Sequence, residues 1–166
     1  FWFDNFSVSG GAISQPQTYI PDDNFENYLE ANGMGNGISN DDYVSTANIN
    51  TVTYLSVSNL NITDLTGIED FIALTDLYCL GNQLTTLDVS QNIALTHLGC
   101  DNNQLTSLDV NNNTLTHLFC WDNQLTSLDL TANTALYYLR CENNQLTSLD
   151  VSANTALTTL YCYNNQ

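Results

Sequence analysis

Five cysteines are the most reactive side chains in this chain of 166 residues, and their spacing is regular. All stand at the same position of a recurring unit, namely Cys79, Cys100, Cys120, Cys141 and Cys162. A metal would need its ligands to converge on one point rather than lie along a line. Parallel neighbours in register also present their Cβ vectors in a geometry that does not suit a disulfide. We therefore expect free thiols that point into a core, where cysteine serves as a small apolar residue.

A file of aspartates recurs with the same period and could bind calcium. Its members are Asp88, Asp109, Asp129 and Asp150. Calcium takes about six to eight oxygen ligands, and one aspartate per unit supplies too few without help from asparagines and carbonyls. Each carboxylate is instead expected to accept N–H groups of the turn that follows it. We predict no cofactor and keep structural calcium as the alternative interpretation.

Two histidines, His97 and His117, follow one another at one position of successive units, with Asp76 and Asp101 expected near His97. A weak metal or acid–base site can be drawn from these residues. Neither histidine has a serine or cysteine nucleophile in a triad, because the cysteines are expected to face the core. The sequence contains neither a glycine-rich phosphate loop nor a Cys-x-x-Cys motif. We therefore predict that the protein is not an enzyme.

The element that must position these residues is a leucine-rich unit that recurs through residues 74–166. Its copies start 21, 20, 21 and 21 residues apart, at Leu74, Leu95, Leu115, Leu136 and Leu157. Each has the pattern L-x-x-L-x-C-x-x-N-Q-L-T-[TS]-L-D-[VL], and the last stops after Asn-Gln. A period near 21 residues lies in the range of leucine-rich repeats. The pattern predicts a right-handed leucine-rich-repeat solenoid, mainly β-strand and turn, with a parallel β-sheet on its concave side and a short helical N-terminal cap.

The invariant leucines and asparagines of the unit have structural explanations. The leucine, cysteine and valine positions are expected to stack into one continuous core. The inward asparagine of each unit is expected to satisfy backbone groups where the strand turns away. This amide ladder comprises Asn82, Asn103, Asn123, Asn144 and Asn165.

The chain divides into three regions. Residues 1–14 have the alternation of a single strand followed by a Gly-Gly linker, and we interpret them as the terminal strand and linker of an upstream domain. Residues 15–51 are predicted to form the N-terminal cap, because 19–33 carry helix signals and a terminal unit must shield the first apolar layer. Residues 52–166 are the repeats, including a divergent first copy, and end within a unit. We therefore interpret the chain as part of a longer protein.

The positions that vary between copies flank the inward leucine and cysteine, and strand alternation points them out of the concave sheet. The file after each cysteine, which includes Asp101 and Glu142, is expected to point outward as well. Tyrosine and tryptophan provide large contact areas, and arginine adds a directional anchor. We predict a ligand-binding surface made of Tyr78, His97, His117, Phe119, Trp121, Tyr138, Arg140, Tyr161 and Tyr163. The alternative is that such aromatics only stabilise packing between strands.

Charge and hydropathy exclude two classes of partner. The chain has 18 acidic residues against one basic residue, which gives a formal charge of −17. Phosphate backbones and anionic lipid headgroups are bound through lysine and arginine, so we expect no nucleic acid and no membrane surface as partners. No run of apolar residues approaches the ~18 that a membrane helix needs, which predicts no membrane insertion.

The repeats resemble those of secreted bacterial surface proteins. The first copy of 22 residues, with its I-T-D-L-T-G-I segment, is similar to the internalin type. The shorter copies resemble the Cys-containing repeats of extracellular, multidomain bacterial proteins, and the I-P-D-D-N-F-E segment resembles the cap that precedes such arrays. The resemblance spans residues 19–166 and implies an extracellular or cell-surface setting.

The same resemblance implies a function. It indicates a non-catalytic binding or adhesion module that recognises a protein or glycan on the concave sheet, beside neighbouring domains of the same parent chain. One alternative is a structural spacer or assembly module within a larger surface protein. Another is an accessory module of a carbohydrate-active enzyme.

Overall fold

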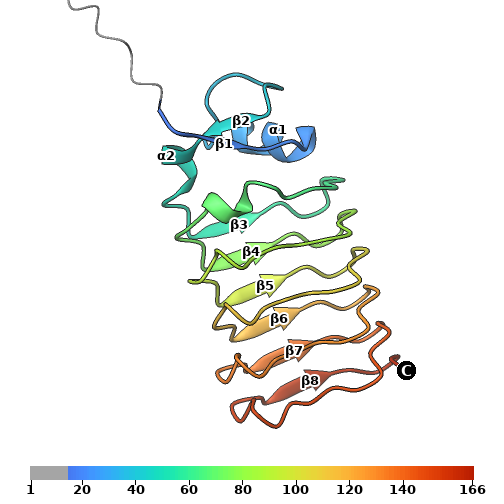
Figure 1. Cartoon of the computed structure of the whole chain (residues 1–166). Coiled ribbons are helices and arrows are strands. Elements are labelled where there is room, and N and C mark those ends of the chain that lie inside the picture. Colours follow the sequence, from blue (N-terminus) through green and yellow to red (C-terminus); the bar gives the residue numbers. More distant parts are fainter. Residues whose placement is uncertain (1–14) are drawn as a thin grey trace, which may run out of the picture.

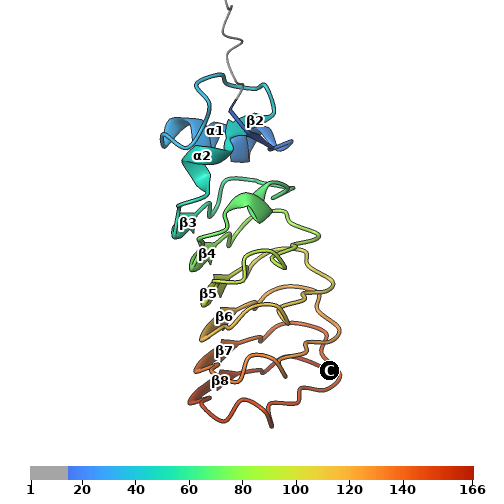
Figure 2. The same ribbon diagram turned by 60° about the vertical axis from the view of Figure 1, so that its left-hand side comes forward.

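In the computed structural model, which describes residues 15–166, the repeats wind into a stack of coils with one short strand per coil (Figure 1). Six strands form a parallel sheet in sequential order. They are β3 Tyr54–Ser56, β4 Asp76–Tyr78, β5 His97–Gly99, β6 His117–Phe119, β7 Tyr138–Arg140 and β8 Thr159–Tyr161. The turned view shows all six along one side of the stack (Figure 2). The predicted leucine-rich-repeat solenoid is confirmed.

The core is one continuous column that runs through the coils. The strands pair in register, so each central leucine stacks on its equivalents, which are Leu55, Leu77, Leu98, Leu118, Leu139 and Leu160. Neighbouring strands lie about 4.8 Å apart, so each leucine is covered by the coils above and below it. All but Leu160 are buried. The stacking of coils, rather than any single coil, keeps the core dry.

All five cysteines are free thiols, as expected, and four of them lie in this core. Burial raises the pKa of Cys79 and of Cys141 to about 12, which keeps both thiols protonated at neutral pH. Cys162 departs from the expectation because it is exposed. It follows β8, and within residues 15–166 no further coil is stacked against that strand. Leu160 is 40% exposed for the same reason.

The predicted asparagine ladder is present, and Asn123 illustrates it. Its Nδ2 donates to the backbone carbonyls of Cys100 and Cys120, at 3.1 and 3.2 Å. Its Oδ1 accepts the N–H of Leu105 at 2.9 Å. The corresponding asparagines bond in the same way, so each amide joins one coil to the preceding one.

A second ladder of buried asparagines lies before the first leucine of each unit, and the sequence analysis missed it. Its members are Asn92, Asn113, Asn133 and Asn154. Each donates its Nδ2 to carbonyls of the preceding coil. Leu136 N–H binds the Asn133 carbonyl at 2.9 Å, whereas in the 20-residue unit Leu115 N–H binds the side-chain Oδ1 of Asn133 instead. The signal was available, because an asparagine recurs two or three residues before each of these leucines.

The second residue after each cysteine position has a left-handed backbone. In Asn102, Asp122, Asn143 and Asn164 the φ angle lies between 50° and 54°, and in Gly81 it is 67°. Asparagine, aspartate and glycine adopt this conformation at the lowest cost. The residue types in this column are therefore explained by backbone geometry.

The region before the array contains two strands and two helices. These are β1 Gln17–Tyr19, α1 Asp23–Ala31, β2 Tyr43–Ser45 and α2 Thr46–Ile49, with β1 and β2 antiparallel. Helix α1 lies within the predicted segment 19–33 and ends at Asn32, followed by Gly33 with a φ of 74°. None of the helices described in residues 15–166 is both long and apolar enough to cross a membrane.

Side-chain contacts attach this region to the first coil. Asp22 precedes α1, and its Oδ1 accepts the N–H groups of Asn24 and Phe25 at 3.0 and 3.1 Å. Its Oδ2 accepts the N–H of Thr63 at 2.8 Å. The Phe25 ring stacks on Phe71 with 6.3 Å between centroids. These contacts shield the first apolar layer, which is what a cap must do; the boundaries 15–51 and 52–166 stay predictions.

The convex side of the described array is mainly turn and extended backbone, as predicted, with one 3-10 helix, η1 Ile68–Asp70, in the first coil. The expected strand and linker at 1–14 lie outside the described residues.

Candidate functional site

The solvent side of strands β3–β8 is the predicted concave face, and we use that name for it below. All nine residues predicted for ligand binding lie on this side, in or just after β4 to β8. Seven are half-buried, whereas Tyr161 and Tyr163 are exposed by 42% and 55%. The three-residue strands bring these side chains together because parallel pairing in register places equivalent positions beside one another.

A stack of rings runs across the middle of the concave face. The rings of His97 and His117 are 4.4 Å apart between centroids and only 15° from parallel, and His117 is also stacked on Tyr138. Nδ1 of His97 lies 3.2 Å from Asp76 Oδ1 and 3.0 Å from the hydroxyl of Thr96. Burial, with the neighbouring His97, lowers the pKa of His117 below its ordinary value.

The only arginine of the chain is held in a second cluster. The Arg140 guanidinium carbon lies 4.9 Å from the ring centroid of Trp121 and 5.4 Å from that of Tyr161. Both distances suit cation–π contacts. Its Nε donates to Glu142 Oε1 at 2.8 Å, and its Nη2 contacts the same oxygen. The hydrogen bond and the charge of Glu142 raise the pKa of Arg140. The guanidinium is thus fixed in place with its charge compensated.

Two carboxylates predicted to point outward are buried instead. Asp101 is 5% exposed and Glu142 is fully buried. The strands end at the residue before each cysteine, so strand alternation no longer sets the direction of the residue after it. Burial raises the pKa of Asp101. The expected proximity of Asp101 to His97 is also wrong, because the hydrogen-bond partner of its carboxylate is Asn102. Of the predicted acidic neighbours, Asp76 is the one that contacts His97.

Further ring contacts extend the two clusters into one surface. Phe119 lies 5.4 Å from Tyr138, and Tyr138 lies 6.2 Å from Tyr161, both measured between ring centroids. Tyr78 pairs with Tyr54 at 5.8 Å, at the other end of the sheet. Aromatic pairs at these distances stabilise strand packing, so part of the predicted structural alternative also holds.

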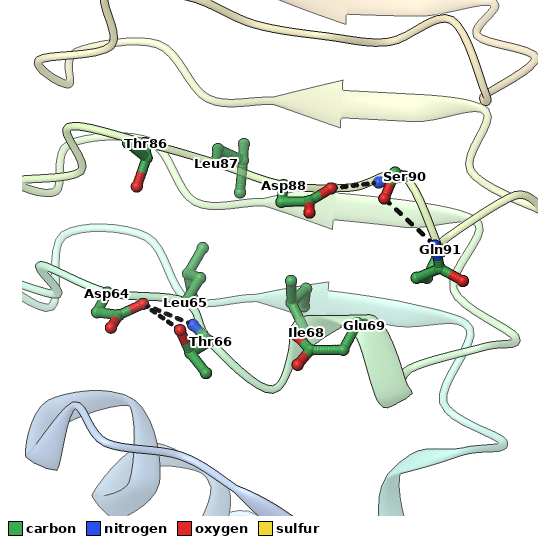
Figure 3. A pocket seen from close by; sticks show the side chains of 10 residues that line it. All are labelled: Asp64, Leu65, Thr66, Ile68, Glu69, Thr86, Leu87, Asp88, Ser90 and Gln91. Atoms are coloured by element: carbon green, nitrogen blue, oxygen red, sulfur yellow. Dashed lines mark hydrogen bonds between the residues drawn. The ribbon is translucent and has the colours of Figure 1, made fainter.

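The recurring aspartates cap turns, as the structural interpretation predicted. Asp88 Oδ1 accepts the N–H of Ser90 at 2.9 Å, and the equivalent bond recurs at Asp109, Asp129 and Asp150. These bonds lower the pKa of Asp88, Asp129 and Asp150. A cavity of about 300 Å³ lies beside Asp88, between the coil of Asp64 and Thr66 and the next one (Figure 3). None of the residues predicted for ligand binding lines it.

A carboxylate cluster in the cap was not anticipated. Ligand atoms of Asp23, Glu26 and Asp42 lie within 4.8 Å of one another. Glu26 is buried, and its two carboxylate oxygens accept the N–H groups of Asp41 and Asp42 at 3.1 and 3.3 Å. The buried carboxylate therefore fastens the loop before β2 to helix α1.

Comparisons with known proteins agree with this geometry. No family model matches the chain. A stretch of 86 residues is 43% identical to internalin J of Listeria monocytogenes, which covers 52% of this chain and 9% of that protein. The crystal structure of an internalin (inlF) from Listeria monocytogenes matches 89% of this chain and 44% of its own, with a TM-score of 0.80 and 26% identity.

A leucine-rich-repeat protein of Leptospira interrogans matches in fold, with a TM-score of 0.65 at 23% identity over 73% of this chain and 33% of that one. The chain spans less than half the length of each of these proteins. The chain is a leucine-rich-repeat solenoid, and its repeats are similar to those of internalins.

Proposed function

We propose that this chain is a non-catalytic recognition module that binds a protein or glycan ligand on its concave face. The observation that carries the proposal is the cluster of Trp121, Arg140 and Tyr161, whose side chains contact one another at positions that vary between repeats. Aromatic residues and arginine that are partly exposed on a fixed surface are the residue types that dominate binding energies.

The scaffold beneath this face supports the proposal because it is fixed by buried contacts. The asparagine ladders tie each coil to its neighbour through side-chain bonds such as those from Asn123 and Asn133. A surface that is already ordered loses little conformational entropy when a ligand binds. Affinity can then come from a few side chains.

A binding role is also easier to support than a catalytic one. Four of the five thiols lie in the core, where burial keeps them protonated. The Nδ1 atoms of His97 and His117 face threonine hydroxyls rather than a nucleophile in a cleft. We further propose an extracellular or cell-surface setting; the similarity to internalins supports it.

The test is a protein and glycan array probed with the intact chain and with the double variant Trp121→Ala, Tyr161→Ala. We expect the double variant to lose at least one ligand of the intact chain, because both faces of the Arg140 contact are removed. Ile93→Ala is the matched control, since Ile93 is an exposed apolar residue outside the strands.

Far-ultraviolet circular dichroism verifies that each variant is folded, and Tyr163→Ser offers a milder change at an exposed position. If every ligand of the intact chain binds the double variant equally well, the face is not a recognition surface, and a spacer role replaces the proposal.

A further inference from the structure

We infer that the concave face takes a basic segment of a protein partner, one that presents lysine or arginine side chains. This inference rests on the proposed function and specifies its ligand. Charge is the first argument. The chain has 18 acidic side chains and a single Lys or Arg, and that one cation, Arg140, is already paired with Glu142. Asp76 and Asp101 add further negative charge to the same side. A partner of opposite charge is therefore favoured.

The second argument concerns the faces of the aromatic rings. The rings of His97 and His117 cover one another at 15°, and His117 is within 12° of parallel to Tyr138. Arg140 lies over Trp121 and Tyr161. A sugar stacks on a free ring face, and these faces are already occupied by neighbours along the sheet. The ring edges, with their hydroxyl and imidazole groups, remain for hydrogen bonds to a polypeptide.

The third argument is a buried acceptor without a donor. Glu142 is fully buried, and its Oε2 has no hydrogen-bond partner, whereas Oε1 accepts from Arg140. Buried carboxylate oxygens are normally satisfied, and an exception calls for an explanation. An ammonium or guanidinium group that enters beside Arg140 would supply the missing donor. Asp76, whose side chain is 29% exposed, is a second acceptor at the other end of the ring stack.

The experiment measures binding of a synthetic peptide of alternating lysine and glycine to the intact chain by isothermal titration calorimetry. A glutamate–glycine peptide of equal length and a panel of neutral glycans are the comparisons. We expect the lysine peptide to bind, and its affinity to fall as salt is raised, because exposed charges are screened. The glutamate peptide is expected not to bind.

Three variants separate a site on the concave face from general attraction to an acidic protein. Asp76→Asn is expected to weaken binding of the lysine peptide about twofold to fivefold, as for loss of one partly exposed ion pair. Arg140→Gln removes the competing cation and is expected to strengthen it by a similar factor. Asp129→Asn makes the same charge change as Asp76→Asn at an exposed turn away from the strands, and is expected to leave the affinity unchanged.

Two outcomes overturn the inference in different ways. Equal losses in Asp76→Asn and Asp129→Asn would mean unspecific attraction. If the lysine peptide does not bind while a neutral glycan does, and that glycan is lost in the Trp121, Tyr161 double variant, the face recognises sugars; the inference then fails and the proposed function stands. If no ligand depends on any variant of the concave face, both fail.

Discussion

The ring of Tyr78 occupies the space that a side chain at position 99 would need. The two residues are partners in the register of β4 and β5, and a Cβ added to Gly99 would lie 2.8 Å from Tyr78 Cδ1. The single glycine in this file of outward residues is thus explained by its neighbour. Position 99 is buried beneath an aromatic ring that belongs to the preceding coil.

The first prediction follows from this pair. Gly99→Ala is expected to lower the free energy of unfolding by about 1–2 kcal/mol, because the added methyl group forces the Tyr78 ring to move. In a Tyr78→Ala background the same change is expected to raise stability by about 0.5 kcal/mol, since alanine loses less backbone entropy than glycine in a strand. Urea unfolding of the four proteins in the cycle measures both effects. A loss of equal size in both backgrounds would mean that the Tyr78 ring is not the cause.

A second prediction concerns the asparagine that supports the 20-residue repeat. Asn133→Ala is expected to cost roughly 2–4 kcal/mol, because the buried Leu115 N–H and Val110 carbonyl both lose their partner. Asn112→Ala is the control at an exposed asparagine and is expected to change stability by less than about 0.5 kcal/mol. Chemical denaturation of both variants provides the comparison. Similar midpoints for the two would contradict a role for the second ladder.

A third prediction concerns pH. The pKa of His117 is lowered by burial and by His97, so the unfolded chain takes up a proton at this residue at higher pH than the folded chain does. The free energy of unfolding is therefore expected to fall as the pH drops from about 7.5 through the ordinary histidine range to about 5.5. His117→Phe keeps a stacked ring without the titration, and its stability is expected to depend less on pH. The check is a series of urea midpoints, and an identical slope for both proteins would refute the assignment.

A fourth prediction tests the attachment of the cap. Asp22→Ala is expected to cost about 2 kcal/mol, because α1 loses its N-cap and Thr63 loses its acceptor. Burial acts to raise the pKa of Asp22, but the hydrogen bonds from Thr63, Phe25 and Asp64 outweigh it, so the pKa is lowered.

The contribution of the Asp22 carboxylate is therefore present above the ordinary aspartate pKa and is lost as the pH falls through the lowered value. Acid unfolding followed by circular dichroism should show a lower midpoint pH for the intact chain than for Asp22→Asn. Asp23→Asn, a neighbouring exposed aspartate that does not cap the helix, is the matched control. Equal acid midpoints for all three proteins would remove Asp22 from the attachment.

The sequence by itself determined the solenoid, its core and the capped turns. A period of about 21 residues with fixed leucine, cysteine and asparagine positions is satisfied by one arrangement, in which equivalent residues stack in register. The role of Asp88 also followed from sequence, because its carboxylate reaches an N–H only two residues further along the chain.

Only the tertiary structure decided what happens between coils. Glu142 and Asp101 are buried because each strand ends before the cysteine, and strand length depends on pairing with both neighbours. Arg140 is held by Trp121 and Tyr161, which lie about one repeat before and after it in the sequence. Such contacts depend on register, rotamer and packing across coils, and the local pattern of a single repeat contains none of that information.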